Sequence, residues 1–201
     1  MQLVLASASP RRRQILRSAG IPFIVRPADV IEAHLPGESP EALVKRLAEA
    51  KARAVWRDGE LVLGADTVVV IDKTILGKPA DDDEARRMLR LLSGRTHRVL
   101  TGIVLFNGTV ARADIEETIV HFRDLDDLEI SEYAATGEPL DKAGAYGIQG
   151  AASKFVPRIE GCYFNVVGLP ISRVYRCIRS SLRCLEQPAG TGDGLSAQPL
   201  R

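Results

Sequence analysis

The sequence contains few cysteines and no excess of charge of one sign. Its three cysteines, Cys162, Cys177 and Cys184, form no CxxC pair and leave an odd number. That pattern argues against a disulfide framework and suits a reducing compartment. The formal net charge is +1, from 27 basic and 26 acidic residues, so the chain lacks the global field that would hold a long polyanion such as DNA. We therefore expect no stable nucleic-acid partner, and any affinity for phosphate must be local.

Long apolar runs are also absent. No run approaches the roughly 18 apolar residues that a membrane-spanning helix needs. The chain starts with a short apolar stretch and continues with three arginines, Arg11 to Arg13, in the reverse order of a secretory signal. We therefore expect a cytoplasmic protein that does not associate with membranes.

Three familiar kinds of site motif are missing. Gly77-Lys78 is followed by Pro79 instead of Ser or Thr, which excludes a P-loop. Gly144, Gly147 and Gly150 are spaced GxxGxxG, which differs from the GxGxxG of a dinucleotide-binding turn. The three histidines have no zinc-binding spacing, and the cysteines have no context that would make one a nucleophile. The sequence therefore predicts neither a zinc site nor covalent catalysis.

Apolar patterns and helix-start signals predict an α/β fold. The chain has 201 residues, of which 45% are hydrophobic, and this is enough for a substantial core. We predict strands at about residues 3–6, 23–25, 61–71, 99–106, 110–122, 155–159 and 163–167, and helices at about 10–19, 40–58, 82–92, 126–135 and 170–185. This order predicts a mixed twisted sheet flanked by helices in one domain, residues 1–186. Residues 187–201, rich in Gly, Pro, Ser, Ala and Thr, are predicted to form a disordered tail.

The segment Ser7-Ala8-Ser9-Pro10-Arg11-Arg12 combines small residues with a helix start. Ser9 is the expected N-cap, and Pro10 suits the first helical position. The free amides of a helix start favour phosphate, and Arg11 and Arg12 would add charge-assisted hydrogen bonds. Cations at a helix N-terminus cost roughly 0.3 to 1 kcal/mol each, which calls for a compensating anion. The alternative is a capped surface helix whose arginines are solvated.

Asp66 lies within an apolar strand, where a carboxylate is costly unless it is paired or binds metal. We expect it to bind metal or activate water; the alternative is a structural cap or ion pair. Glu32, in a polar loop, could complete an oxygen site for Mg²⁺ or Mn²⁺ with Asp66, or it could be a solvated acid.

Two lysines are weaker candidates. Lys78 lies on a stiff loop between Gly77 and Pro79, which suits a point charge directed at phosphate, although a plain exposed lysine is the alternative. Lys51, near the end of its helix, would by itself be a surface residue. The acidic run at residues 81–84 is expected to open a helix with favourable charges rather than to bind a metal.

Five separated motifs, taken in order, resemble the Maf family of nucleotide pyrophosphatases over about residues 3–185. The motifs are Ser7-Ala8-Ser9-Pro10-Arg11-Arg12, Gly64-Ala65-Asp66-Thr67, Leu76-Gly77-Lys78-Pro79, Leu92-Ser93-Gly94-Arg95-Thr96-His97 and Asp141-Lys142-Ala143-Gly144-Ala145-Tyr146-Gly147-Ile148-Gln149-Gly150. The resemblance implies a mixed α/β fold similar to the inosine triphosphate pyrophosphatases, with a cleft between two lobes. It also implies a divalent metal cation and a homodimer.

The resemblance also implies roles for particular residues. Asp66, Lys51 and Lys78 are the expected catalytic residues, with both lysines on the phosphates, and Glu32 and Asp66 are the expected metal ligands. The expected substrate-binding residues are Ser7, Ser9, Arg11, Arg12 and Gln149.

The form Ala-Tyr-Gly-Ile-Gln-Gly at residues 145–150 is similar to the branch that acts on dTTP and UTP. The branch that prefers 7-methyl-GTP has a glutamate where Gln149 stands. A glutamine amide both donates and accepts, so it can pair with the O4 and N3–H edge of uracil or thymine.

The expected reaction is hydrolysis of dTTP and UTP to the monophosphate and pyrophosphate, by in-line attack of water on the α-phosphorus. An enzyme that clears modified pyrimidine triphosphates would differ only in its substrate. A nucleotide-binding regulator of septum formation in cell division is an alternative of a different class.

Overall fold

The structure, a computed structural model, describes residues 1–186, with the side chains of residues 1–181. The tail predicted at 187–201 lies outside the described residues. The helices are α1 (Pro10–Ser18), α2 (Pro40–Val55), α3 (Asp82–Leu92), α4 (Asp127–Ala134), α5 (Tyr163–Val167) and α6 (Ile171–Glu186). The strands are β1 (Gln2–Leu5), β2 (Ile24–Val25), β3 (Glu60–Ile71), β4 (Thr74–Leu76), β5 (Thr96–Phe106), β6 (Ala111–His121) and β7 (Arg158–Glu160). Three short 3₁₀ helices are η1 (Glu138–Asp141), η2 (Ala143–Ala145) and η3 (Ala151–Phe155).

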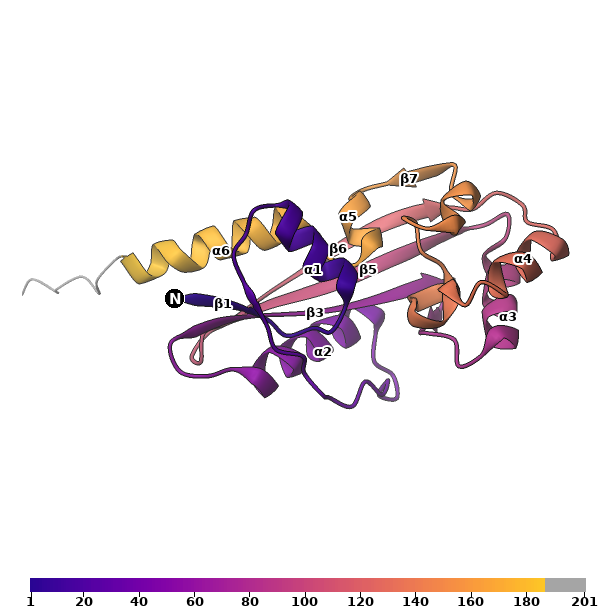
Figure 1. Ribbon diagram of the computed structural model, residues 1–201. Coiled ribbons are helices and arrows are strands. Elements are labelled where there is room, and N and C mark those ends of the chain that lie inside the picture. The colour runs from indigo at the N-terminus through magenta and orange to yellow at the C-terminus, as the bar shows by residue number, and fades with distance from the viewer. Residues whose placement is uncertain (187–201) are drawn as a thin grey trace, which may run out of the picture.

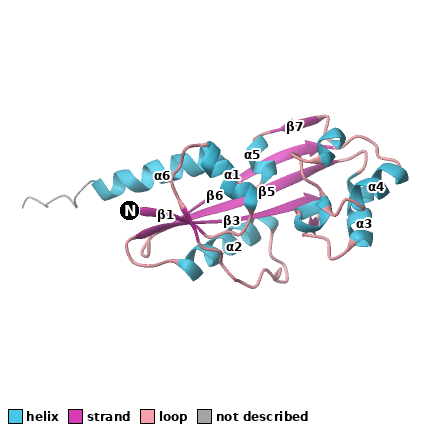
Figure 2. Ribbon diagram, viewed as in Figure 1, coloured by secondary structure: helices cyan, strands magenta, loops and turns pink. Residues whose placement is uncertain are grey.

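One sheet of seven strands forms the centre of the molecule. Its order is β2-β1-β3-β5-β6-β7, with β4 paired to part of β3. Strand β1 is parallel to β2 and β3, whereas β3, β5, β6 and β7 are antiparallel in sequence, so the sheet is mixed. Figure 2 shows the long strands β3, β5 and β6 as the central layer between helices. The predicted mixed sheet flanked by helices is therefore confirmed.

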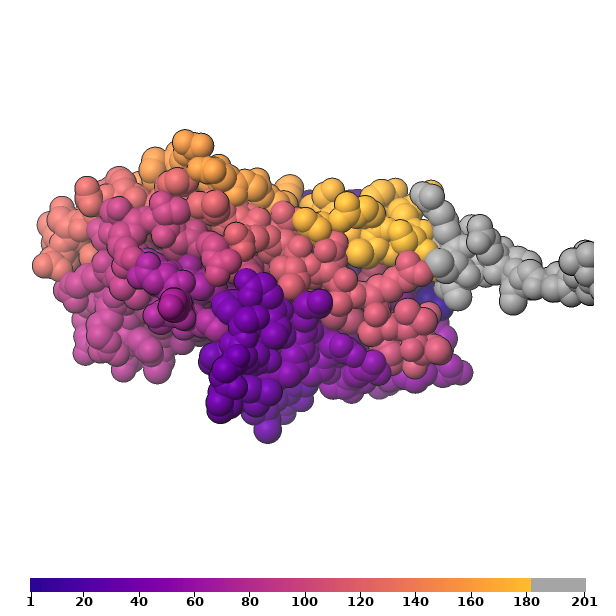
Figure 3. All heavy atoms as spheres, turned by 180° about the vertical axis from the view of Figure 1, so that it is seen from behind, coloured from indigo at the N-terminus to yellow at the C-terminus, as the bar shows by residue number. Residues whose placement is uncertain are grey.

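The helices cover both faces of this sheet. Helix α2 packs on β3 and β5 on one face, and α1, α5 and α6 lie over the other (Figure 1). Seen from behind, the segment around α2 projects from one edge of the molecule (Figure 3). Helices α3 and α4 and the 3₁₀ helices lie together at the end of the long strands that is distant from β1 (Figure 1). They pack around an apolar core that includes Leu89, Phe122 and Phe155. Within the described residues, no helix has the length and apolarity to cross a bilayer.

Local sequence signals account for most of the element boundaries. Ser9, Ser39 and Asp81 cap their helices, each through a side-chain oxygen that accepts an N–H of the first turn. Ser9 was expected to do so, Ser39-Pro40 repeats the start signal of Ser9-Pro10, and the acidic run at 81–84 opens a helix as expected. Asn107-Gly108, between the runs at 99–106 and 110–122, predicts a hairpin, and β5 and β6 form it. In its turn, Asn107 Oδ1 accepts hydrogen bonds from the N–H groups of Thr109 at 3.1 Å and Val110 at 2.8 Å.

Two predicted strands near the C-terminal end are wrong. Residues 163–167 form helix α5, and residues 155–159 divide into the end of η3, a connection and the start of β7. The side chain of Asn165 explains the helix, because it is fully buried and donates to Val99 O and to Thr118 Oγ1, both at 2.9 Å. These distant partners override the preference of Tyr, Phe and Val for strands. Strand β4, at 74–76, was not predicted.

Two glycines let helix α2 approach the sheet closely. A Cβ atom on Gly64 in β3 would lie 2.0 Å from Ala48 O, and one on Gly102 in β5 would lie 2.5 Å from Val44 O. The helix backbone therefore lies directly on the two strands. This close approach brings Lys51, near the end of α2, against Asp66, two residues beyond Gly64.

We predict that Gly64→Ala lowers the free energy of unfolding by about 1 to 3 kcal/mol, because the new methyl group must displace the backbone of α2. Urea unfolding measures the change. Gly77→Ala is the matched control, since nothing lies within 4 Å of its Cβ position, and its stability should equal that of the wild type. Equal stability of both variants would contradict the tight contact.

Candidate active site

A cavity of about 790 Å³ lies between the start of α1, the α2–β3 layer, the loop after β4 and the segment from η1 to η3. This volume suits a ligand of nucleotide size. All nine candidate site residues line it: Ser7, Ser9, Arg11, Arg12, Glu32, Lys51, Asp66, Lys78 and Gln149. The fold thus brings together residues that are up to 142 positions apart, the separation of Ser7 and Gln149.

Lys51 connects the two candidate acids at the base of the cavity. Its Nζ lies 2.6 Å from Asp66 Oδ1 and 2.5 Å from Glu32 Oε1. Lys51 and Asp66 are each 7% exposed, whereas about half of the Glu32 side chain is exposed. The buried ammonium offsets part of the negative charge of the two carboxylates. Without it, each acid would lose a short, charge-assisted contact.

The two carboxyl groups have opposite pKa shifts. Burial raises the pKa of Asp66, although the charges of Lys51 and Arg12 and the hydrogen bond from Lys51 act in the other direction. For Glu32, burial also acts to raise the pKa, but the hydrogen bond and charge of Lys51, with Lys78 and Arg12, together lower it. The net shift therefore favours the protonated form at Asp66 and the ionised form at Glu32, relative to the ordinary pKa of each group.

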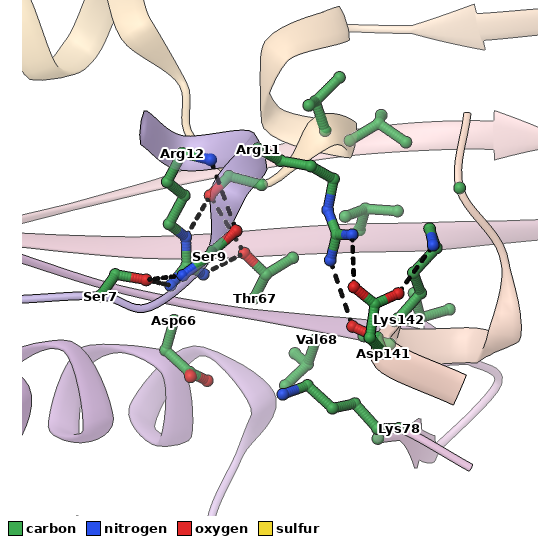
Figure 4. Close-up of a pocket in the computed structure, with 18 of the residues that line it drawn as sticks. Ser7, Ser9, Arg11, Arg12, Asp66, Thr67, Val68, Lys78, Asp141 and Lys142 are labelled. Carbon is green, nitrogen blue, oxygen red and sulfur yellow. Dashed lines mark hydrogen bonds and ion pairs between the residues drawn. The ribbon is translucent and has the colours of Figure 1, made fainter. Parts of the chain in front are cut away.

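Arg12 is buried and is directed into the protein. Its guanidinium donates to Gly168 O at 2.8 Å, Ala65 O at 2.8 Å, Ser7 Oγ at 3.2 Å and Thr67 Oγ1 at 3.0 Å. Figure 4 shows these bonds joining the start of α1 to β3. Four of its five N–H groups thus have protein acceptors, so the expected contact of Arg12 with phosphate stays a prediction.

Arg11 faces the opposite wall of the cavity. Its Nη1 lies 2.9 Å from Asp141 Oδ2 and its Nη2 donates to Asp141 O at 3.2 Å (Figure 4). Lys142 Nζ donates to the other carboxylate oxygen of Asp141 at 2.7 Å. Asp141 and Lys142 belong to a motif that the sequence singled out, but that motif alone assigned them no role.

Lys78 is the candidate cation without a hydrogen bond or ion pair to the part of the chain that the structure describes. Its side chain is exposed and extends into the cavity on the side of Asp66 and Val68 (Figure 4). Gln149 is exposed at the rim formed by residues 147–150. The cavity therefore has a cationic end at Arg11 and Lys78 and an amide at its rim.

The residues present fit a divalent cation in one way. Among residues 1–186 no group of three or more His, Cys, Asp or Glu side chains could hold a metal ion. Glu32 and Asp66 nevertheless lie close together, because both contact Lys51 Nζ. Their carboxylates provide only oxygen donors, which suit Mg²⁺ or Mn²⁺. Mg²⁺ is commonly held by one or two carboxylates together with substrate phosphates. The two acids therefore fit a cation that arrives with a phosphate ligand.

The mixed α/β fold and this cation-lined cavity define an α/β protein with a site for an anionic ligand of nucleotide size. The chain belongs to the Maf family, because the profile described as Maf-like protein matches residues 2–181. The resemblance indicated by the five motifs is thereby confirmed.

Two curated relatives and one solved structure align with most of the chain. The chain is 54% identical over 181 residues to the protein named dTTP/UTP pyrophosphatase of Koribacter versatilis (strain Ellin345), covering 89% of this chain and 94% of that protein. It is 52% identical over 179 residues to the protein of the same name of Symbiobacterium thermophilum, covering 88% and 92%. A solved structure, the Ham1 protein of Staphylococcus aureus, aligns with a TM-score of 0.45 and 12% identity over 92% of this chain and 100% of that chain.

We predict different effects for the two neighbouring arginines. Arg12→Lys should lower the free energy of unfolding by about 2 kcal/mol or more, because one ammonium cannot satisfy four acceptors spread around a guanidinium. Arg11→Lys should change it by less than about 1 kcal/mol, since this pair is partly exposed. Urea unfolding of both variants measures the difference, and equal losses would show that Arg12 does not have this structural role.

Proposed function

We propose that this protein hydrolyses dTTP and UTP to the nucleoside monophosphate and pyrophosphate. The observation that carries the proposal is the buried Asp66 carboxylate, held by Lys51 beside Glu32, in a cavity with Arg11 and Lys78 at its cationic end. The names of relatives that are about half identical over most of the chain support the same activity and substrates.

The phosphates would bind at the start of α1. Pro10 has no N–H, and Ser9 Oγ accepts from the N–H of Arg12. Among the described residues this leaves the N–H of Arg11 as the first-turn amide open to an anion. The Arg11 side chain would exchange Asp141 for phosphate oxygens, and Lys78 would neutralise further charge. These cations act where negative charge is redistributed during transfer.

The chemical step is an in-line attack of water on the α-phosphorus. A bond forms between the water oxygen and phosphorus, the bond from phosphorus to the bridging oxygen breaks, and pyrophosphate leaves. Asp66 would either accept the proton of the attacking water or hold a cation, and its raised pKa favours the first role. When a divalent cation is bound, Glu32 and Asp66 would hold it, and it would neutralise charge on the phosphates.

The base would lie at the rim near Gln149. The Gln149 amide can accept a hydrogen bond from N3–H and donate one to O4 of uracil or thymine. The clearing of modified pyrimidine triphosphates uses the same geometry and differs only in the base. The homodimer, the cytoplasmic location and the absence of a stable nucleic-acid partner stay predictions.

We predict that Asp66→Asn lowers kcat at least about 100-fold while the affinity for dTTP is retained, because the amide cannot accept the proton. Release of pyrophosphate with Mg²⁺ or Mn²⁺ measures turnover, and calorimetry measures binding. Asp72→Asn is a matched control at an exposed aspartate that pairs with Arg95 outside the cavity. Full turnover of Asp66→Asn would exclude its catalytic role, and orthophosphate as the product would show that the wrong bond was assigned. A regulator of septum formation that only binds nucleotide would keep its function in this variant.

We predict that Gln149→Glu lowers the ratio of kcat/KM for UTP to that for GTP at least about tenfold, because a carboxylate cannot donate to O4. Gln14→Glu, at an exposed position of α1, is the control. Steady-state kinetics with both nucleotides measure the ratio. Unchanged relative rates would show that Gln149 does not read the base.

A further inference from the structure

The residue proposed to read the base lies on a tight turn with little support of its own. Gly147 O accepts the N–H of Gly150 at 3.0 Å, so residues 147–150 form a closed turn that presents Gln149 at the rim of the cavity. The Gln149 side chain is exposed and has no hydrogen bond to the described part of the chain. Its position therefore depends on what holds the turn.

An amide on a movable turn would discriminate poorly between pyrimidines. Rotation of a glutamine amide by half a turn exchanges its donor and its acceptor. One orientation matches the O4 and N3–H of uracil, and the other matches the N4–H₂ and N3 of cytosine. Selectivity for uracil and thymine consequently requires other residues to hold Gln149 in one position.

One carboxylate holds both ends of this turn. At the first end, the N–H of Gly147 donates to Tyr133 Oη at 3.2 Å, and Tyr133 Oη donates to Glu138 Oε1 at 3.1 Å. At the second end, the N–H of Ala151 donates directly to Glu138 Oε2 at 3.1 Å. One oxygen of Glu138 thus reaches the first end of the Gln149 turn through the Tyr133 hydroxyl, and the other accepts directly from the N–H that follows its second end.

The glycines of the turn make room for this carboxylate. A Cβ on Gly150 would lie 2.0 Å from Glu138 Oε1. A Cβ on Gly147 would lie 2.5 Å from Lys142 Cε and 3.1 Å from Glu138 Oε1. Neither glycine has a positive φ, so space for Glu138 and Lys142, not backbone conformation, accounts for their positions.

The groups that hold the turn are themselves firmly placed. Tyr133 is 2% exposed and packs edge-to-face on Phe155, with ring centroids 5.4 Å apart. Burial raises the pKa of Tyr133, so its hydroxyl keeps its proton for Glu138. Lys142 Nζ donates to Glu138 O at 2.6 Å, which holds the backbone from which the carboxylate extends.

We propose that Tyr133 and Glu138 are positioning residues for base selectivity, because together they hold the Gly147–Gly150 turn that presents Gln149. Neither residue needs to touch the base. We expect their effect to be confined to the rim, because Lys78 and Asp66 belong to other segments of the cavity wall and Arg11 contacts η1 through Asp141 and not through Glu138. This inference rests on the proposed function for the identity of the substrate.

The test uses Tyr133→Phe and Glu138→Gln in the full-length protein. Tyr133→Phe deletes the hydroxyl that links the first end, and Glu138→Gln replaces one accepting oxygen by an NH₂ group. For each, the ratio of kcat/KM for UTP to that for CTP should fall about tenfold, the scale of one lost hydrogen bond. The inhibition constant of inorganic pyrophosphate should stay within about twofold, since that product occupies the cationic end. The double variant should lose no more selectivity than the more affected single variant, because both residues act on one turn.

The matched controls make the same two chemical changes at exposed residues outside the Gly147–Gly150 turn. Tyr175→Phe changes an exposed tyrosine of α6, and Glu132→Gln changes an exposed acid of α4 next to Tyr133. Both should keep the wild-type ratio. An unchanged ratio in Tyr133→Phe and Glu138→Gln, or equal weakening of UTP, CTP and pyrophosphate, would overturn the proposal and leave the pair with a purely structural role.

The proposed function is judged separately by wild-type release of pyrophosphate from UTP. If that release is absent, calorimetry with non-hydrolysable UTP and CTP analogues tests the positioning role of Tyr133 and Glu138 through binding alone. A wild-type preference for the UTP analogue that both variants reduce supports this role. Absence of that preference in the wild type, or its persistence in both variants, overturns it.

Discussion

The buried guanidinium of Arg12 is the contact on which the candidate site depends. It joins the segment before α1, strand β3 and the carbonyl of Gly168 after α5, which are distant in sequence. Buried carbonyls without a donor are costly, so the three segments are held in one arrangement as long as Arg12 is present. The segment before α1 is thereby tied to β3 next to Asp66. Arg12 is thus part of the framework of the cavity, whereas Arg11 pairs with the exposed Asp141.

The charged side chains that line the cavity fall into a buried group and a more exposed group. Lys51 is nearly buried, and its Nζ lies within 2.6 Å of both Asp66 and Glu32, so each of these charges has an opposite charge beside it. The close contact of α2 with β3 at Gly64 places this ammonium against Asp66. Arg11, by contrast, pairs with the exposed Asp141, and such a pair contributes little to stability. The structure therefore separates buried charges around Asp66 from more exposed charges at Arg11 and Asp141, where the phosphates are proposed to bind.

Sequence reasoning succeeded where the deciding interactions are local. The caps at Ser9 and Ser39, the helix start at the acidic run 81–84 and the turn at Asn107 depend on neighbours within three residues, and each was predicted. Helix α5 was missed because its conformation depends on hydrogen bonds from Asn165 to strand residues 66 and 47 positions away. Arg11 and Arg12 could not be distinguished for the same reason, since adjacent arginines have the same local signal and opposite surroundings. The motifs and Glu32 and Lys51 identified residues that all line the cavity, but the sequence did not predict which of these residues contact one another.

The proposed base selectivity needs both the sequence motif, which identifies the residue, and the fold, which shows what positions it. The motif identifies Gln149, but an amide alone is compatible with uracil and with cytosine, so the identity of the residue does not by itself determine a preference. The missing information lies in Tyr133 and Glu138, which precede the motif and look like an ordinary buried aromatic and a surface acid. Only the fold shows that one carboxylate meets both ends of the turn and that Gly150 leaves the space for it. A glycine in such a motif can therefore mark the position of a neighbouring side chain rather than that of the ligand.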